Sequence, residues 1–252
     1  MRIDTRLRAT LAGLATATAL LALLAIGGAG CGGSGGTGGS GIMSTPYNDV
    51  DAGPPQMTSG PYQPLGVGST WTYHVDDQGV TYEKDSSVEA LEDIGGMAAG
   101  TMGYRVRETI KASIQLTWYE KTDTDVRRHH DQVQDNTGRM LSDEWYAPYL
   151  LRVDEAPEHL QTGATWTINY AKTKTTTSKP ETTTNQAETW KVDGVDVVTA
   201  TKAGVFSALR VTRTDTSDGS TKTQWFVRGV GKVRELTGAG HFEELTAYTI
   251  AP

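Results

Sequence analysis

Gly68-Ser69-Thr70-Trp71-Thr72 is the stretch that decides the fold, because it returns 95 residues later as Gly163-Ala164-Thr165-Trp166-Thr167. Each copy begins with a glycine and places a tryptophan between two β-branched threonines, as at the start of a β-strand. Looser echoes follow both copies in the same order, which suggests an ancient duplication. We therefore expect two repeat-like halves, residues 61–158 and residues 159–252, within one folded unit.

Strand-like segments fill both halves. In Tyr104-Arg105-Val106 and in Leu209-Arg210-Val211 apolar and charged residues alternate, which favours β-structure. No long helical period appears after residue 30. The sequence predicts an all-β fold, an antiparallel meandering sheet that curves into a half-barrel or open barrel. Turn signals separate the strands at Asp77-Gln78-Gly79, Asn136-Thr137-Gly138, Asp193-Gly194, Asp218-Gly219 and Gly238-Ala239-Gly240.

Two segments depart from the pattern of the other strand-like segments. The threonine-rich residues 173–184 have the composition of an O-glycosylated stalk, but flanking strand-like sequence favours a hairpin that turns at Lys179-Pro180-Glu181. Residues 141–160 contain two prolines and are predicted to connect the halves. The expected strands are 70–75, 81–90, 103–111, 114–121, 124–133, 165–177, 182–192, 195–201, 206–216, 222–227, 232–236 and 242–250.

The first 30 residues have the three parts of an export signal. Arg2, Arg6 and Arg8 precede an uncharged run, rich in Leu and Ala, that ends at Ile26, and small residues follow up to Gly30. The apolar run of about 18 residues is at the short limit of a membrane span, so an uncleaved transmembrane helix is the alternative. We expect residues 1–30 to be a signal helix that is removed between Gly30 and the next residue.

Gly28-Ala29-Gly30-Cys31 resembles the lipobox of bacterial lipoproteins, although lipoboxes usually carry Leu where this chain has Gly28. The resemblance implies that Cys31 is alkylated with diacylglycerol and often acylated at its new N-terminus. Two or more acyl chains hold a protein stably on a membrane. The lipoprotein sorting rule retains proteins with Asp after the cysteine at the inner membrane. Gly32 therefore implies the outer membrane, with the protein facing the periplasm or the cell surface.

Residues 32–60 are dominated by Gly, Ser and Pro and show no apolar periodicity. Residues 31–60 are therefore expected to be the lipidated cysteine and a disordered tether. A phosphate-binding glycine loop is excluded, because no strand precedes the segment, no helix follows it and no Lys-Ser/Thr pair is present.

Charge and cysteine content exclude several classes of function. Removing the signal, which carries three arginines and one aspartate, changes the net charge from −7 to −9. Nucleic acid is therefore not an expected partner. Cys31 is the only cysteine, so its lipidation excludes both disulfides and cysteine catalysis. We expect no cofactor, no metal site and no catalytic residues, because G-x-S-x-G, H-E-x-x-H and P-loop motifs are absent.

Weaker candidates for chemistry remain. His129-His130 is the only histidine cluster, and its members point to opposite faces of a strand, so we expect an exposed strand end rather than a metal site. Glu243-Glu244 and Asp143-Glu144 are candidates for a carboxylate pair across the fold, with solvated surface as the alternative. Trp145, Tyr146, Tyr149 and Leu151 form the candidate binding surface, with a packed connector as the alternative.

Both ends of the folded region carry a further resemblance. The segment from Pro64 to Tyr73 has the pattern P-L-x-x-G-x-x-W-x-Y, and the segment from Trp225 to Val233 has the pattern W-[YF]-x-x-G-V-G-x-V. Both resemble segments of uncharacterised bacterial lipoproteins. Some of these are similar to the half-barrels of periplasmic lipoprotein carriers, which implies a concave sheet able to hold acyl chains.

Three hypotheses follow for the function. The first is a non-catalytic envelope lipoprotein that binds or scaffolds, with the membrane and envelope proteins as its partners. The second is a carrier or chaperone that holds lipid acyl chains or a lipoprotein in its concave sheet. The third is a hydrolase that uses carboxylates.

Overall fold

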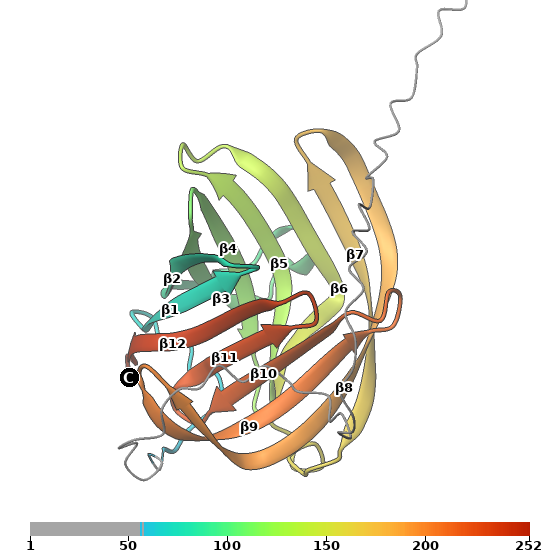
Figure 1. Ribbon diagram of the computed structural model, residues 1–252. Coiled ribbons are helices and arrows are strands. Elements are labelled where there is room, and N and C mark those ends of the chain that lie inside the picture. Colours follow the sequence, from blue (N-terminus) through green and yellow to red (C-terminus); the bar gives the residue numbers. More distant parts are fainter. Residues whose placement is uncertain (1–55, 57) are drawn as a thin grey trace, which may run out of the picture. The chain divides into compact units, whose positions relative to one another are not determined.

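The computed structural model describes residue 56 and residues 58–252 (Figure 1). Its strands follow one another around a single antiparallel sheet in the order of the chain, so the predicted all-β meander is confirmed. The elements are β1 (Thr70–Asp77), β2 (Val80–Asp93), η1 (Gly96–Ala98), β3 (Met102–Ile110), β4 (Ser113–Lys121), β5 (Asp125–Asp135), β6 (Met140–Asp154), β7 (Thr165–Thr176), β8 (Lys179–Thr201), β9 (Gly204–Asp215), β10 (Thr221–Val227), β11 (Gly231–Thr237) and β12 (His241–Thr249).

The sheet curves further than the expected half-barrel or open barrel. β1 pairs with β12 from Thr70↔Thr249 to Asp77↔His241, which closes a twelve-stranded ring. Closure removes both sheet edges, whose unpaired backbone groups would otherwise invite aggregation. The repeated tryptophan segments begin β1 and β7, six strands apart in this ring, while the duplication itself stays a prediction.

Two boundary predictions are wrong. Residues 141–160 are not only a connector, because β6 occupies their first part and pairs with β7 from Ser142↔Thr176 to Ala147↔Ala171. Asp193-Gly194 is not a turn between two strands. Register shifts around Gly194 show a bulge, so β8 runs without a break to Thr201.

The threonine-rich tract forms the predicted hairpin. β7 ends at Thr176 and β8 begins at Lys179, so the turn lies two residues before the expected position. The side-chain hydroxyls of Thr173 and Thr183 are 2.9 Å apart across the two strands. These strands pair with each other up to the hairpin, and their threonines alternate between the two faces of the sheet.

One end of the barrel, called here the closed end, is filled by apolar side chains. Pro61 and Tyr62 pass across this end: the Gly229 amide donates to the Pro61 carbonyl over 2.8 Å, and the Tyr62 amide donates to Glu155 over the same distance. Leu65 is buried beside them. The largest side chains of this apolar floor are Trp71, Trp190, Phe206, Leu209, Phe226 and Leu245.

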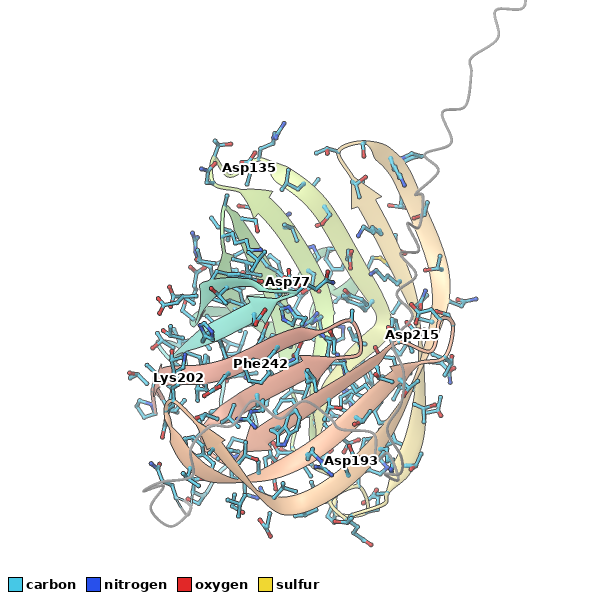
Figure 2. The ribbon with its side chains drawn as sticks, viewed as in Figure 1. Asp77, Asp135, Asp193, Lys202, Asp215 and Phe242 are labelled. Carbon is cyan, nitrogen blue, oxygen red and sulfur yellow. The ribbon has the colours of Figure 1, made fainter. Side chains whose placement is uncertain are left out.

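The other end, called here the open end, consists of hairpin tips. The β5–β6 and β7–β8 hairpins extend further than the β9–β10 and β11–β12 hairpins (Figure 1). Asp135 and Asp215 lie at this end, whereas Lys202 lies on the connection between β8 and β9 at the opposite end (Figure 2). The closed end is therefore packed with apolar side chains, whereas the open end is bordered by hairpins of unequal length.

The paired tryptophans of the repeat allow a matched stability test. Trp71 is 3 % exposed, and its indole N–H donates to the Val230 carbonyl over 2.6 Å. Trp166 is only partly buried, and its indole N–H has no partner among the described residues. We predict that Trp71→Phe lowers the free energy of unfolding by about 1–3 kcal/mol, because a buried carbonyl loses its donor. Urea denaturation should show a smaller loss for Trp166→Phe, and an equal or larger loss would contradict the assignment.

Candidate functional site

Two of the cavities formed by the described residues lie between the apolar floor and the open end of the barrel. The upper chamber, of about 700 Å³, is lined by β5–β7, β8–β9 and the β9–β10 and β11–β12 hairpins. The lower chamber, of about 360 Å³, lies among β2–β6 and β10–β12. Arg128, Lys222 and Thr237 line both. Eight strands enclose just enough room for side chains, so a twelve-stranded ring has interior space left over.

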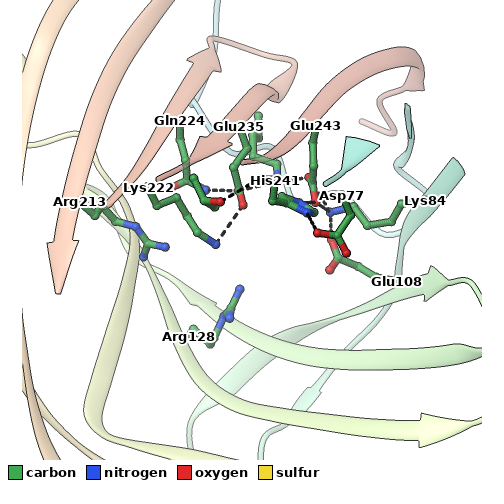
Figure 3. A network of polar contacts seen from close by, with 12 residues as sticks. Asp77, Lys84, Glu108, Arg128, Arg213, Lys222, Gln224, Glu235, His241 and Glu243 are labelled. Carbon is green, nitrogen blue, oxygen red and sulfur yellow. Dashed lines mark hydrogen bonds and ion pairs between the residues drawn. The ribbon is translucent and has the colours of Figure 1, made fainter. Parts of the chain in front are cut away.

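Charged side chains form a network in the lower chamber (Figure 3). The Lys232 ammonium lies 2.8 Å from Glu235 and 2.5 Å from Glu243. The Lys84 ammonium lies 2.7 Å from Glu243 and 3.6 Å from Glu108. Lys84, Lys232, Glu235 and Glu243 are each about 95 % buried. Together with Glu108, these four residues are called the lysine–glutamate network.

A backbone irregularity places two members of the network on one face. Lys232 and Glu235 are three residues apart, so a regular strand would point them to opposite faces. The register between β10 and β11 shifts between Trp225 and Phe226, which leaves Val233 as an extra residue on β11. Such a bulge re-aims the neighbouring side chains, and here both charges point inward.

The network fixes the charge state of its members. Burial by itself would raise the pKa of Glu235 and Glu243, but Lys232 and other cations hold both pKa values far below their ordinary range. Burial likewise opposes the charge on Lys232, yet Glu235 and Glu243 raise its pKa above the ordinary value. The three groups therefore stay ionised throughout the neutral pH range.

Removing the shared cation should destabilise the barrel. We predict that Lys232→Met lowers the free energy of unfolding by about 3–5 kcal/mol, because it leaves buried carboxylates without their main partner. Adding Glu243→Gln to the same chain should restore part of that loss. Lys191→Met, whose side chain is 60 % exposed, is the control in the same denaturant titrations. A loss no larger than that of the control would contradict the role of Lys232.

Glu235, His241 and Glu243 also have the spacing of a metal site, since one ligand atom of each lies within 4.8 Å of the others. The carboxylates, however, already contact Lys232 and Lys84. The hydrogen bond from Glu243 raises the pKa of His241. A histidine must be neutral to bind a metal, so the cluster is better described as an ion network.

A second ion cluster, on β5, β6 and β7, borders the upper chamber, which two of its members, Tyr146 and Lys172, line. The Tyr146 hydroxyl lies 3.0 Å from Asp131 and 2.9 Å from Glu144. Lys172 and Lys174 reach Glu144 over 2.8 Å and 2.6 Å. Burial would raise the pKa of Glu144, but both lysines and Tyr146 lower it to about 2. This carboxylate is therefore ionised in the folded barrel and favours the folded state.

Glu144 should make stability depend on acid. Its pKa falls from 4.5 to about 2 on folding, so its stabilisation is complete above about pH 5 and is lost as pH falls through the folded pKa. We predict that Glu144→Gln unfolds more readily at pH 7 and that the difference from wild type shrinks between pH 5 and pH 2. Thermal unfolding at several pH values measures this. A difference that stays constant with pH would contradict the assignment.

The four residues of the candidate binding surface do not form one surface in the structure. Tyr146 lines the upper chamber, and Leu151 is buried in the apolar floor. Trp145 stacks on His130 with ring centroids 3.8 Å apart, and the Arg127 guanidinium lies over the Tyr149 ring. Of these four residues, only Tyr146 lines a chamber. Gly30 and Cys31 lie outside the described residues.

The histidine prediction is wrong about exposure. His129 and His130 are 8 % and 7 % exposed, and they contact different carboxylates, Glu120 and Asp143. His130 lies between the rings of Trp118 and Trp145, which accounts for its burial. The other carboxylate candidates separate in the same way: Glu243 is buried in the lysine–glutamate network, whereas Glu244 accepts from the Lys202 amide.

Sequence reasoning did not single out the arginines and the lysine that line the chambers: Arg128, Arg152, Arg213 and Lys222. All four lie within strands, where a charged residue is ordinarily assigned to the solvated face. In β10 the polar residues Lys222 and Gln224 occupy alternate positions, which places both on the inward face. This two-residue period is a sequence signal for a polar interior. Arg152 had no such signal, because it is the extra residue of a β6 bulge opposite Val126 and Arg127.

Among the described residues, no helix combines the length and apolar character needed to cross a membrane. Comparisons with protein-family models, with curated proteins and with solved structures each gave no match. The site therefore has to be interpreted from its own geometry.

Proposed function

We propose that the chain is an exported lipoprotein, anchored to the outer membrane through Cys31, whose barrel binds a small polar molecule in its lumen without catalysis. The export signal and the lipobox resemblance support the anchor. The observation that carries the binding function is the upper chamber of about 700 Å³, which lies at the open end and is lined by charged and hydroxyl-bearing side chains. Ligand pockets of 300–1,000 Å³ with a few placed polar groups are typical of small-molecule sites.

The chemistry of the lumen ranks the alternatives. A lipid carrier needs an apolar cavity, and the charged groups of both chambers would lose hydration against an acyl chain. A carboxylate hydrolase needs one carboxyl group whose pKa is raised so that it can act as an acid. Glu144, Glu235 and Glu243 all have lowered pKa values instead. Binding of a polar molecule is therefore the function that the geometry favours.

The anchor is tested by removing its attachment point. We expect Cys31→Ala to leave the membrane fraction, because the thiol that would carry diacylglycerol is gone. Wild type and a Gly32→Ala control, both retaining the thiol, should stay with membranes after a high-salt wash. If Cys31→Ala stays as firmly bound as wild type, lipid on this cysteine does not hold the protein.

Ligand binding in the lumen is tested by native mass spectrometry of the full chain, extracted from a bacterial envelope in mild detergent. We predict that wild type retains an additional small mass. Thr237→Trp should lose it, because Thr237 lines both chambers and a tryptophan there fills them.

Thr223→Trp is the matched control, since the residue lies on the outer face of neighbouring β10 between inward-facing Lys222 and Gln224. This variant should keep the mass. Absence of any bound mass in wild type, or equal retention by Thr237→Trp, would overturn the proposal.

A further inference from the structure

Positive charge exceeds negative charge on the wall of the lower chamber. Its lining includes three carboxylates, all of them members of the lysine–glutamate network. Its cations are Lys84, Arg128, Arg152, Lys222 and Lys232. Lys84 and Lys232 are engaged by the network carboxylates, and Arg128 is paired with Asp131 over 2.9 Å. Lys222 is itself paired with Glu235 over 3.0 Å, so the excess positive charge lies with Arg152.

Arg152 has no carboxylate within ion-pair distance among the described residues, although its charge helps to lower the pKa of Glu108 and of Glu235. Among the described residues it makes neither an ion pair nor a hydrogen bond within the protein, and its guanidinium lies 5.5 Å from the centre of the Phe226 ring. The β6 bulge brings it into the lining of the lower chamber, just above the apolar floor. An arginine that lines a cavity without a carboxylate partner presents a planar set of donors suited to an oxyanion.

Lys222 and Arg213 add to the positive charge. They lie directly opposite each other on β10 and β9, an arrangement of like charges that destabilises a sheet unless something compensates it. The ion pair of Lys222 with Glu235 spans 3.0 Å, and that of Arg213 with Glu188 spans 3.4 Å. Glu235 raises the pKa of Lys222, but burial and the charges of Arg213 and Lys232 outweigh it, so the pKa lies below its ordinary value.

These side chains come from opposite walls. Lys222 and Arg213 extend from the β10 and β9 side, and Arg128 extends toward them from β5 (Figure 3). The upper chamber, which these three side chains also line, has a different surface on another wall, formed by Tyr146, Leu150 and Tyr170. The rings of Tyr146 and Tyr170 meet edge to face with their centres 5.9 Å apart. The charged site thus adjoins an aromatic and aliphatic wall, because Arg128 and Lys222 line both chambers.

We propose that the lumen binds a small organic oxyanion, with its phosphate or carboxylate group between Arg152, Lys222 and Arg128 and its uncharged body against Tyr170 and Leu150. This inference rests on the proposed binding function and names the class of ligand. The anion supplies the direct ion pair that Arg152 lacks within the described residues and relieves the repulsion between Lys222 and Arg213. Its body fills the upper chamber, which is larger than a phosphate ion needs.

Isothermal titration calorimetry of the full chain in detergent tests the proposal with phenyl phosphate, benzoate and the neutral probe phenol. We expect phenyl phosphate or benzoate to bind at least 10-fold more tightly than phenol. The stronger of the two anions identifies the charged group as phosphate or carboxylate. Binding should weaken as NaCl rises, because salt screens the charges.

Arg152→Gln and Lys222→Gln should each weaken anion binding about 10- to 100-fold, the range for a lost hydrogen bond to a charged group. Arg107→Gln is the matched control, since its side chain is 41 % exposed and does not line either chamber. Arg152→Gln should leave the unfolding temperature of the ligand-free chain unchanged, which separates a binding role from a structural one. Lys222→Gln provides a second test if Arg152→Gln does not fold.

Two results would overturn the inference. One is binding no tighter for the anions than for phenol; the other is anion binding that survives both Arg152→Gln and Lys222→Gln. A neutral small mass retained in native mass spectrometry alongside the first result would leave the proposed binding function standing. If native mass spectrometry finds no retained mass and none of the probes binds, both the proposed binding function and the oxyanion inference are wrong.

Discussion

The ammonium group of Lys232, between Glu235 and Glu243, is the interaction on which the rest of the barrel depends. It lies where the apolar floor gives way to the chambers, and Gln224, which is fully buried, donates to the same Glu235 over 2.7 Å. Charges buried there are tolerated only because each carboxylate has a cation within ion-pair distance. The network thus lets a polar lumen begin directly above a dry core.

The size of the ring explains why the lumen exists. Twelve strands enclose more volume than side chains fill. Side chains fill this volume at one end of the barrel and leave part of it empty at the other. At the closed end Tyr62 and Leu65 cover packed aromatic residues. At the open end the walls carry charges, and the space between them remains as two chambers. An arginine without a carboxylate and two adjacent cations then favour an anionic occupant over an acyl chain.

Most of the fold could be predicted from the sequence, because strand composition and glycine turns are local signals. Closure could not, since the pairing of Thr70 with Thr249 depends on accumulated twist and on strand number. The side chains that line the interior of the barrel could be predicted even less, because bulges decide which of them point inward. Lys232 and Glu235 share a face only because of the bulge at Val233, and Arg152 lines the chamber only because of another. Of the four aromatic and aliphatic candidates, Tyr146 alone lines a chamber, because neighbouring residues on β6 lie in different environments.

A crystal structure of the chain grown with phenyl phosphate measures the central claim most directly. We predict a tetrahedral density within hydrogen-bond distance of both Arg152 and Lys222, a ring beside Tyr170, and an unchanged lysine–glutamate network. A lumen in which Arg152 pairs with a carboxylate of the barrel, or one closed by side chains with the anion bound elsewhere, would contradict the claim that this barrel is a receptor for a small oxyanion.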